Sequence, residues 1–310
     1  MPFQESPKSE NSKSSKDANK LASLLLASLS GLLLALAWMS PGTWLCAVAG
    51  WLFAFCLSAS ILKSEGSYLN GFVAGVLALG LAIRWLYHTI SYFGGIGPFL
   101  SMLLMGIFTV LSALQFVLFV FFYRNLPPIL RKTGMGLAIA WVCAEFIFPG
   151  LFPWFAGHTQ IAFLPFAQIA DIAGVQLISF MMFWVSEQLL SSSTRLKRLC
   201  AFSAFALFLI YGLGCIAYYS KLTGPLQAVA VIQANISIED KHNVAMIQTN
   251  VKRYVELSKE VQKPGTLIIW PESVVTEAIY DKMQNASQSK TLSLLPEGNP
   301  FIVGALSFES

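Results

Sequence analysis

Charged residues are scarce in this chain of 310 residues. Asp, Glu, Lys and Arg make up 12% of it, against about 25% in typical soluble domains, while 55% of the residues are hydrophobic. This composition excludes an ordinary soluble domain and indicates a membrane protein. The formal net charge of only +4 also argues against nucleic-acid binding, which needs a strongly basic surface.

Cysteine is absent after Cys215. The five cysteines all lie in or beside hydrophobic stretches, at Cys46, Cys56, Cys143, Cys200 and Cys215. No disulfide framework is therefore expected in the polar last part of the chain, even in a compartment that permits disulfides. That part also offers no thiol nucleophile.

Long hydrophobic runs, by contrast, are abundant. Seven of them approach the roughly 20 residues that cross a bilayer as a helix, at 20–39, 43–62, 69–92, 98–123, 134–149, 162–190 and 199–219. The fifth is short and the sixth is long enough to tilt or kink. We therefore expect a seven-helix membrane domain over residues 20–220. Residues 1–19 are too poor in apolar side chains to fold alone and are expected to form a disordered tail.

Lys and Arg are missing from the first, third and fifth loops between these runs. The tail and the other three loops carry Lys8, Lys13, Lys16, Lys20, Lys63, Arg124, Arg131, Lys132, Arg195, Lys197 and Arg198. Cytoplasmic loops are enriched in Lys and Arg, so the pattern predicts a cytoplasmic N-terminus. Seven crossings then place residues 221–310 on the outer side of the membrane.

Polar side chains within the apolar runs need a partner, a cavity or a function, and three of them stand out. Arg84 and His88 are four residues apart and share one helix face, and Glu145 lies in the fifth run. Arg84 and Glu145 could form a structural ion pair, or each could reach the headgroups. Alternatively, Arg84 and His88 line a route for a lipid phosphate. We favour the structural interpretation, and the functional one stays open.

Two outward loops, 91–99 and 148–160, are rich in aromatic residues, Gly and Pro. An aromatic belt at the membrane interface explains single members such as Trp154. The whole string PWFAGHTQ, residues 153–160, also suits a loop that holds acyl chains near an outward-facing active site. Both interpretations remain open from the sequence.

The last ninety residues, 221–310, change character. Apolar runs that suit buried strands alternate with helical patterns, which gives strand 225–237, helix 247–262, strand 266–270, helix 287–295 and strand 300–308. Strands alternating with helices predict an α/β layer fold. In such a fold active residues gather at the carboxyl ends of strands.

Glu272 comes directly after the apolar strand of TLIIWPES. Trp270 and Pro271 would shield its carboxylate from water, which raises a carboxyl pKa and suits general-base catalysis. A surface loop acid is the simpler explanation for a single Glu. From the residues alone, Glu272 is therefore only a candidate.

The chain resembles the apolipoprotein N-acyltransferase family over about residues 20–310. The resemblance rests on strings in a fixed order, AIRWLYHTISYFGG, AWVCAE, FPWFAGHTQ, LPFAQIADIAGVQLISF, VAVIQANIS and above all LIIWPES. This family joins a bundle of transmembrane helices to an outward-facing nitrilase-type domain. The resemblance implies a multi-pass protein of the bacterial inner membrane, with residues 221–310 as the first part of a periplasmic nitrilase-like sandwich.

The implied reaction moves an acyl chain from a phospholipid to the N-terminal diacylglyceryl-cysteine of a bacterial lipoprotein, through a thioester and without a cofactor or metal. In the family a Glu acts as base, a Lys stabilises the oxyanion and a Cys is the nucleophile. Glu272 matches the base. Arg84, His88 and Trp154 are the residues that we expect along the lipid path.

The chain departs from the family pattern in two places. The Lys and Cys that follow further downstream have no counterpart, because Lys282 and Lys290 are expected to be surface charges; a chain of this extent is expected to be inactive unless completed. Phe146 and its neighbours replace the arginine that usually follows the residue matching Glu145. The alternatives are a non-catalytic membrane protein that binds lipid or lipoprotein, and a multi-pass transporter, for which no internal repeat is found.

Overall fold

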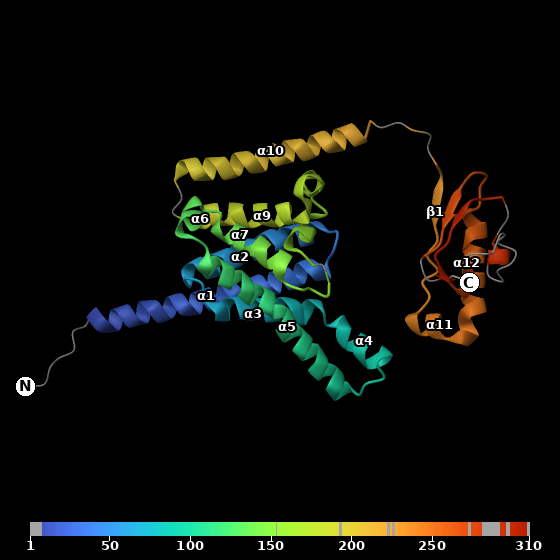
Figure 1. Ribbon diagram of the computed structural model, residues 1–310, viewed down its shortest axis with the longest axis horizontal. Coiled ribbons are helices and arrows are strands. Elements are labelled where there is room, and N and C mark those ends of the chain that lie inside the picture. Colours follow the sequence, from blue (N-terminus) through green and yellow to red (C-terminus); the bar gives the residue numbers. More distant parts are fainter. Residues whose placement is uncertain are drawn as a thin grey trace, which may run out of the picture. The chain divides into compact units, whose positions relative to one another are not determined.

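The computed structural model describes residues 8–152, 154–191, 194–221, 224, 227–271, 274–280, 292–295 and 298–308. The chain divides into two compact units, Met1–Lys221 and Leu222–Ser310. The first unit is helical, and the second carries short parallel strands (Figure 1).

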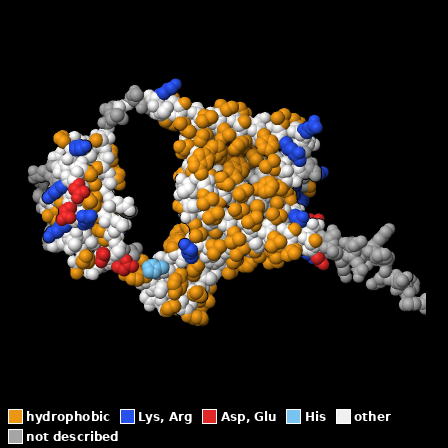
Figure 2. Space-filling view, turned by 180° about the vertical axis from the view of Figure 1, so that it is seen from behind, with side chains coloured by type: hydrophobic (Ala, Val, Ile, Leu, Met, Phe, Trp, Pro, Cys, Tyr) orange, Lys and Arg blue, Asp and Glu red, His pale blue; other side chains and the backbone are white. Residues whose placement is uncertain are grey.

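The first unit holds long apolar helices. Within the described part of the chain, five helices are long and apolar enough to cross a membrane, namely α1 (Lys8–Met39, from Lys16 onward), α2 (Trp44–Lys63), α5 (Pro98–Asn125), α9 (Ala170–Leu190) and α10 (Arg195–Tyr219). Apolar side chains cover most of the visible face of this unit, with Lys and Arg toward its edges (Figure 2). Such an apolar surface suits lipid and not water. The chain is a multi-pass membrane protein.

A sixth candidate crossing consists of two helices, α3 (Tyr68–Ala82) and α4 (Trp85–Phe93), bent by 58°. At the bend the amide of Leu86 donates a hydrogen bond to the carbonyl of Ile83, three residues earlier, at 2.8 Å. This tighter bonding replaces the α-helical pattern at the break. The hydrophobic run 69–92 is therefore a broken helix.

The fifth hydrophobic run, 134–149, forms α7 (Gly136–Ile147), which has 12 residues. Its length of about 18 Å is less than the roughly 30 Å of a bilayer core. α9 is also interrupted, because Ala173 and Gly174 have non-helical backbone angles. Helix length in the described residues supports five or six crossings, against the seven that the hydrophobic runs predict.

Rings from three longer helices surround α7. Trp141 of α7 stacks on Phe183 of α9 with 4.6 Å between ring centroids. Phe53, Phe116 and Phe119, from α2 and α5, contact the same indole at 5.2–5.4 Å. All five rings are buried, and each such pair adds about 0.5–1.5 kcal/mol beyond its buried area. Ring packing therefore fixes the short helix among its neighbours.

Two glycines allow α3 to approach its neighbours closely. A Cβ atom at Gly31 of α1 would lie 2.5 Å from the carbonyl oxygen of Ala74. A Cβ atom at Gly75 would lie 3.0 Å from Ala113 of α5. Small residues let membrane helices pack backbone to backbone, which matters because lipid supplies little hydrophobic drive for helix association.

The second unit contains a three-stranded parallel sheet in the order β1 (Val229–Val231), β2 (Leu267–Ile269) and β4 (Phe301–Ile302). α12 (Ile247–Val261) connects the first two strands and matches the predicted helix. Its buried residues pack with those of the sheet in one core. The remaining short elements are α6 (Pro128–Thr133), α8 (Leu164–Ala167), α11 (Ile238–His242), η1 (Ala156–Gln160), η2 (Val244–Met246) and η4 (Leu292–Leu294).

Two further strands, β3 (Val275–Tyr280) and β5 (Ala305–Phe308), form a separate parallel pair. β3 is not among the strands predicted from the sequence, and the strand predicted over 300–308 is divided into β4 and β5. Most of the helix expected over 287–295 lies outside the described residues. The second unit is thus α/β with parallel strands, as far as it is described.

The prediction of a disordered tail over 1–19 is wrong for residues 8–19, because these residues continue α1 toward the N-terminus. Residues 1–7 lie outside the described residues. Nucleating a helix is costly, whereas each residue added to an existing helix gains a hydrogen bond. The apolar part of α1 supplies the nucleus on which this polar segment extends.

Candidate functional site

Glu272, the base that the resemblance implies, lies outside the described residues. The strand before it is well anchored. Beyond Ile269, the end of β2, the side chain of Trp270 is 3% exposed, and its Nε1 donates a 2.9 Å hydrogen bond to Ser258 of α12. Pro271 is exposed. The buried indole of Trp270 therefore anchors the chain directly after β2, two residues before the candidate base.

Arg84 and His88 lie near the bend between α3 and α4, and both are exposed. Arg84 is the N-cap residue of α4 and makes no capping bond with its side chain. His88 stacks on Tyr92 with 5.8 Å between ring centroids and 17° between planes. The described residues provide no ion pair for either side chain. Both groups are accessible to a charged ligand.

Glu145 is buried, with 5% of its surface exposed. Its Oε1 accepts three hydrogen bonds, from Trp141 Nε1 at 2.7 Å, Ala156 N at 2.8 Å and Ser179 Oγ at 3.1 Å. These donors belong to α7, η1 and α9. Among the described residues Arg84 does not pair with Glu145, because the chain after α7 turns back and brings neutral donors to the carboxylate.

The end of the loop after α7 is anchored to α2. Gln160 is buried, and its Nε2 donates a 3.0 Å hydrogen bond to the carbonyl of Ala47. Gly50 makes room for Thr159, because a Cβ atom at Gly50 would lie 2.0 Å from the Thr159 hydroxyl oxygen. The last part of the string PWFAGHTQ therefore has a structural role.

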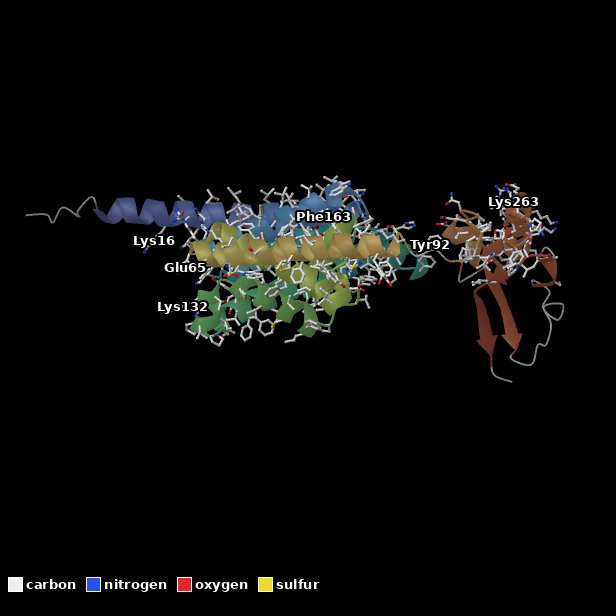
Figure 3. The ribbon with its side chains drawn as sticks, turned by 90° about the horizontal axis from the view of Figure 1, so that it is seen from above. Lys16, Glu65, Tyr92, Lys132, Phe163 and Lys263 are labelled. Carbon is white, nitrogen blue, oxygen red and sulfur yellow. The ribbon has the colours of Figure 1, made fainter. Side chains whose placement is uncertain are left out.

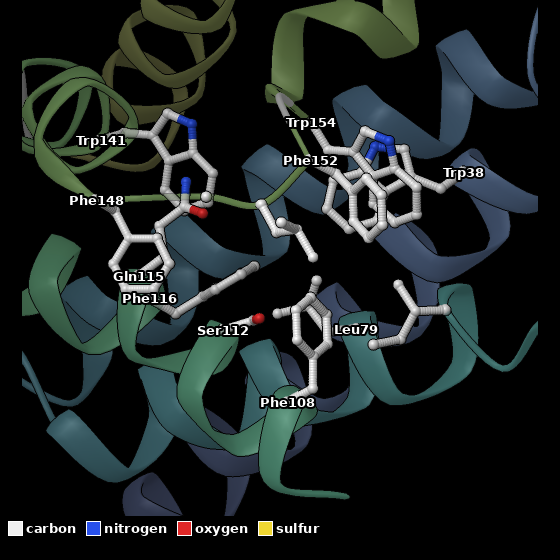
Figure 4. Close-up of a pocket in the computed structure, with 13 residues that line it drawn as sticks. Trp38, Leu79, Phe108, Ser112, Gln115, Phe116, Trp141, Phe148, Phe152 and Trp154 are labelled. Atoms are coloured by element: carbon white, nitrogen blue, oxygen red, sulfur yellow. The ribbon is translucent and has the colours of Figure 1, made fainter. Parts of the chain in front are cut away.

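The aromatic part of the same loop borders a cavity of about 40 Å³ (Figure 4). Trp154 packs against Trp38 of α1 at 5.1 Å and against Phe152 at 5.5 Å. Phe152 also contacts Trp85 of α4 at 5.6 Å. The cavity has room for about three water molecules, and its walls come from α1, α3, α5, α7 and the loop.

Polar groups also line this cavity. Ser112 and Gln115 face it from α5, and Trp38 Nε1 has no hydrogen-bond partner in the described residues. None of these three residues was predicted from the sequence. The spacing of Ser112 and Gln115 within the apolar run 98–123 puts them on one helix face and could have identified them. Trp38 carried no such signal, because its neighbour Trp154 is distant in the sequence.

Glu187, near the end of α9, is a second buried acid that the sequence analysis missed. Its Oε2 accepts a 2.8 Å hydrogen bond from the amide of Leu137 in the first turn of α7. The next residue, Gln188, donates through Nε2 to the carbonyl of Gly134 at 2.6 Å. First-turn amides have no partner within their own helix, so Glu187 caps α7 from a neighbouring helix.

The five cysteines all belong to the first unit, whereas Glu272 belongs to the second. Cys46 and Cys56 are buried, and Cys200 is exposed. Across the described ranges, no three His, Cys, Asp or Glu side chains gather in a way that could hold a metal ion. Among the described residues that the sequence singled out, the candidates for binding a lipid are therefore the lining of the aromatic cavity and the exposed side chains near Arg84.

Comparison with protein families matches residues 30–187 to the N-terminal domain of apolipoprotein N-acyltransferase. The match spans half of the chain and includes Arg84, Glu145 and Trp154. The chain belongs to the apolipoprotein N-acyltransferase family. Glu272 lies beyond the matched segment.

Apolipoprotein N-acyltransferases from several bacteria are similar over longer stretches. The protein of Geobacter metallireducens is 30% identical over 299 residues, which cover 89% of this chain and 56% of the relative. That of Haemophilus influenzae is 30% identical over 274 residues, or 84% of this chain and 51% of the relative. That of Wigglesworthia glossinidia brevipalpis is 29% identical over 212 residues, or 66% and 42%. The chain spans about half the length of these relatives.

Replacing Glu145 by Leu should destabilise the helical unit of this acyltransferase-family chain. The change leaves the Trp141 indole and the Ala156 amide without their acceptor, and each buried unpaired donor costs about 1–3 kcal/mol. The melting temperature of the protein in detergent should fall by roughly 5–10 °C. Glu145→Gln keeps an accepting oxygen and should lose much less. Equal losses in the two variants would contradict this role for Glu145.

Proposed function

We propose that the polypeptide carrying this chain transfers an acyl chain from a phospholipid to the N-terminal diacylglyceryl-cysteine of bacterial lipoproteins. The family match of residues 30–187 carries the proposal, and the similarity to named relatives over most of the chain supports it. The partners are then a phospholipid donor and a diacylated lipoprotein, which meet at the bacterial inner membrane. No cofactor enters the reaction.

The proposed mechanism has two acyl-transfer steps. In the first, Glu272 takes the proton of a cysteine thiol while the sulfur attacks the phospholipid ester; the C–O bond breaks, and the proton passes to the departing lysophospholipid oxygen. In the second, the lipoprotein amine attacks the thioester, and Glu272 accepts its proton as the thiolate leaves. A lysine stabilises the oxyanion in both steps. We assign the thiol and the lysine to no residue of this chain.

We propose that residues 221–310 belong to a nitrilase-like sandwich. α12 covers one face of the sheet formed by β1, β2 and β4. Val229, Val231 and Ile302 are 51%, 72% and 53% exposed, and strand alternation and register put them on the other face. This apolar face suits contact with a second sheet. In that arrangement Glu272 follows the carboxyl end of β2.

We assign Trp154, Arg84 and His88 to the path of the acyl donor. Ile83 lines the aromatic cavity, and Arg84, which is exposed, is the next residue of the chain. Guanidinium groups bind phosphate strongly, and aromatic walls suit an acyl chain. The cavity measures only about 40 Å³, which is too small for an acyl chain. An acyl chain would therefore enter only after side chains of the loop 148–160 move.

We propose a cytoplasmic N-terminus and a periplasmic location for residues 221–310. Lys16 and Lys132 lie at one end of the helical unit, and Tyr92 lies at the other (Figure 3). Ends rich in Lys and Arg stay in the cytoplasm. Seven crossings, with α7 as the short one, then carry the chain to the outer side.

Protease digestion of spheroplasts tests this orientation. Protease added outside should cut after exposed basic residues of the second unit, such as Lys252 and Lys259, and should leave an N-terminal epitope tag intact. The tag should become sensitive only after the membrane is permeabilised. Loss of the tag in intact spheroplasts, with the second unit protected, would reverse the orientation.

Glu272→Gln should reduce acyl transfer by at least about 10²-fold, because the amide cannot take the thiol proton. The assay is mass spectrometry of the lipoprotein N-terminal peptide, which separates diacylated from triacylated forms. Glu260→Gln, the same change at an exposed position of α12, should leave the rate unchanged. Normal acylation by Glu272→Gln would refute the base assignment. No acylation by the unchanged polypeptide would favour a non-catalytic lipid- or lipoprotein-binding role.

Trp154→Ala should separate a donor-binding role from an aromatic belt. If Trp154 borders the acyl path, its loss should lower kcat/KM for the phospholipid about tenfold and change the preference for acyl-chain length. Trp44→Ala removes another aromatic residue that is 65% exposed, and it should change neither quantity. Identical effects of the two substitutions would assign Trp154 to the belt.

A further inference from the structure

A cleft lies at the end of the helical unit opposite Tyr92, between the start of the apolar part of α1 and the turn from α2 to α3 (Figure 3). Its volume of about 660 Å³ falls within the usual range for ligand sites. Basic, polar and apolar side chains share its lining, among them Lys16, Lys20, Lys63, Ser64, Ser67 and Leu69. The proposed acyl transfer makes no use of this cleft.

The cleft carries excess positive charge. Lys16 and Lys20 lie one helical turn apart on α1, and Lys63 ends α2. Among the described lining residues Glu65 is the single acid, and the described residues provide no ion pair for any of the three lysines. Like charges four residues apart on a helix repel each other. An anion in the cleft would relieve this repulsion.

The turn that carries Lys63 is held from α5. Arg124 donates a 3.3 Å hydrogen bond to the carbonyl of Gly66, and its guanidinium lies 5.1 Å from the centre of the Tyr68 ring. Glu65 has a φ of 53°, which residues other than glycine seldom adopt. These contacts keep one wall of the cleft in a defined shape before any ligand arrives.

Hydrogen bonds between polar side chains connect the helices that form the cleft. The rim of the cleft, by contrast, is apolar. Asn70 is 3% exposed and donates a 2.9 Å hydrogen bond to Ser60, whose hydroxyl donates at 2.7 Å to the carbonyl of Ser23. Leu21 and Leu69 line the same cleft and are 60% and 59% exposed. The cleft thus offers charge to a headgroup and apolar surface to the chains attached to it.

We propose that this cleft binds the phosphodiester headgroup of an anionic phospholipid, whose acyl chains lie along Leu21 and Leu69. Ammonium groups form charge-assisted hydrogen bonds with phosphate oxygens, and basic pockets between membrane helices suit anionic headgroups. A free phosphate ion would use the lysines but not the exposed leucines. The cleft and the aromatic cavity are separate, so this lipid is not the acyl donor.

A second basic pocket, of about 200 Å³, provides a comparison. It is lined by Arg131, Lys132 and Lys197, but Lys197 already donates to the carbonyl of Lys132. The buried carboxylate of Glu187 also lies in its lining. An anion there would meet a carboxylate, so we assign no lipid to this pocket.

Native mass spectrometry of the protein with added phosphatidylglycerol tests the proposal. Lys20→Gln/Lys63→Gln should weaken phosphatidylglycerol binding by about tenfold, because two of the three ammonium groups are lost. The control Lys132→Gln/Arg195→Gln removes the same charge outside the cleft and should change binding by less than about twofold. All four side chains are exposed, so both variants should melt at the temperature of the unchanged protein when lipid is absent.

Three results would overturn the proposal. Equal weakening in the two variants would indicate general attraction to surface charge. Binding of phosphatidylcholine as tight as that of phosphatidylglycerol would remove the role of the lysines. Displacement of the lipid by millimolar inorganic phosphate would assign the cleft to free phosphate. Lipid binding at this cleft and acyl transfer are separate readouts, so failure of this proposal would leave the proposed function standing.

Discussion

A buried carboxylate determines the geometry around α7. An acid inside an apolar bundle is costly unless hydrogen bonds compensate its burial. Oε2 of Glu145 has no partner among the described residues, and Oε1 accepts hydrogen bonds from donors on three elements. One of them is the backbone amide of Ala156, which reaches Glu145 only if the chain reverses soon after α7. The reversal carries Phe152 and Trp154 across the cavity. The aromatic wall of the cavity therefore depends on an acid that does not line it.

The same constraint explains how a helix of 12 residues lies among longer ones. Inside a membrane every backbone polar group needs a partner in the protein, and a helix that ends short of the headgroups leaves its terminal amides and carbonyls unpaired. Glu187 supplies an acceptor at the start of α7. Glu145 ties its end to η1 and α9, and Trp141 fills the space between. At the start of α7, a side chain of the neighbouring helix α9 thus serves as the partner of a first-turn amide.

Much of the helical unit could be predicted from the sequence. Segments that lie in lipid must be apolar over about 20 residues, and the loops between them can carry charge. The run 43–62 corresponds closely to α2, and the run 20–39 matches the apolar part of α1 but not its polar start. The partners of Glu145 could not be predicted, because a backbone amide has no sequence signature. Counting charges suggested Arg84 instead. In the second unit, strands of two or three residues are shorter than any reliable alternation pattern, and β3 contains Glu277 and Ala278, which disfavour strands.

The two ends of the helical unit differ in chemistry, one being aromatic and the other basic. To set the orientation of the protein in the membrane, positive charges need only lie at one end of the helices. For that role they could be distant from one another. Lys16, Lys20 and Lys63 are exposed but line one cleft together, so an anion there would meet their combined charge. An anionic lipid that binds only the folded state would stabilise that state by an amount that grows with the logarithm of the lipid concentration above Kd. Membrane composition would then influence the stability of the helices that support the aromatic cavity.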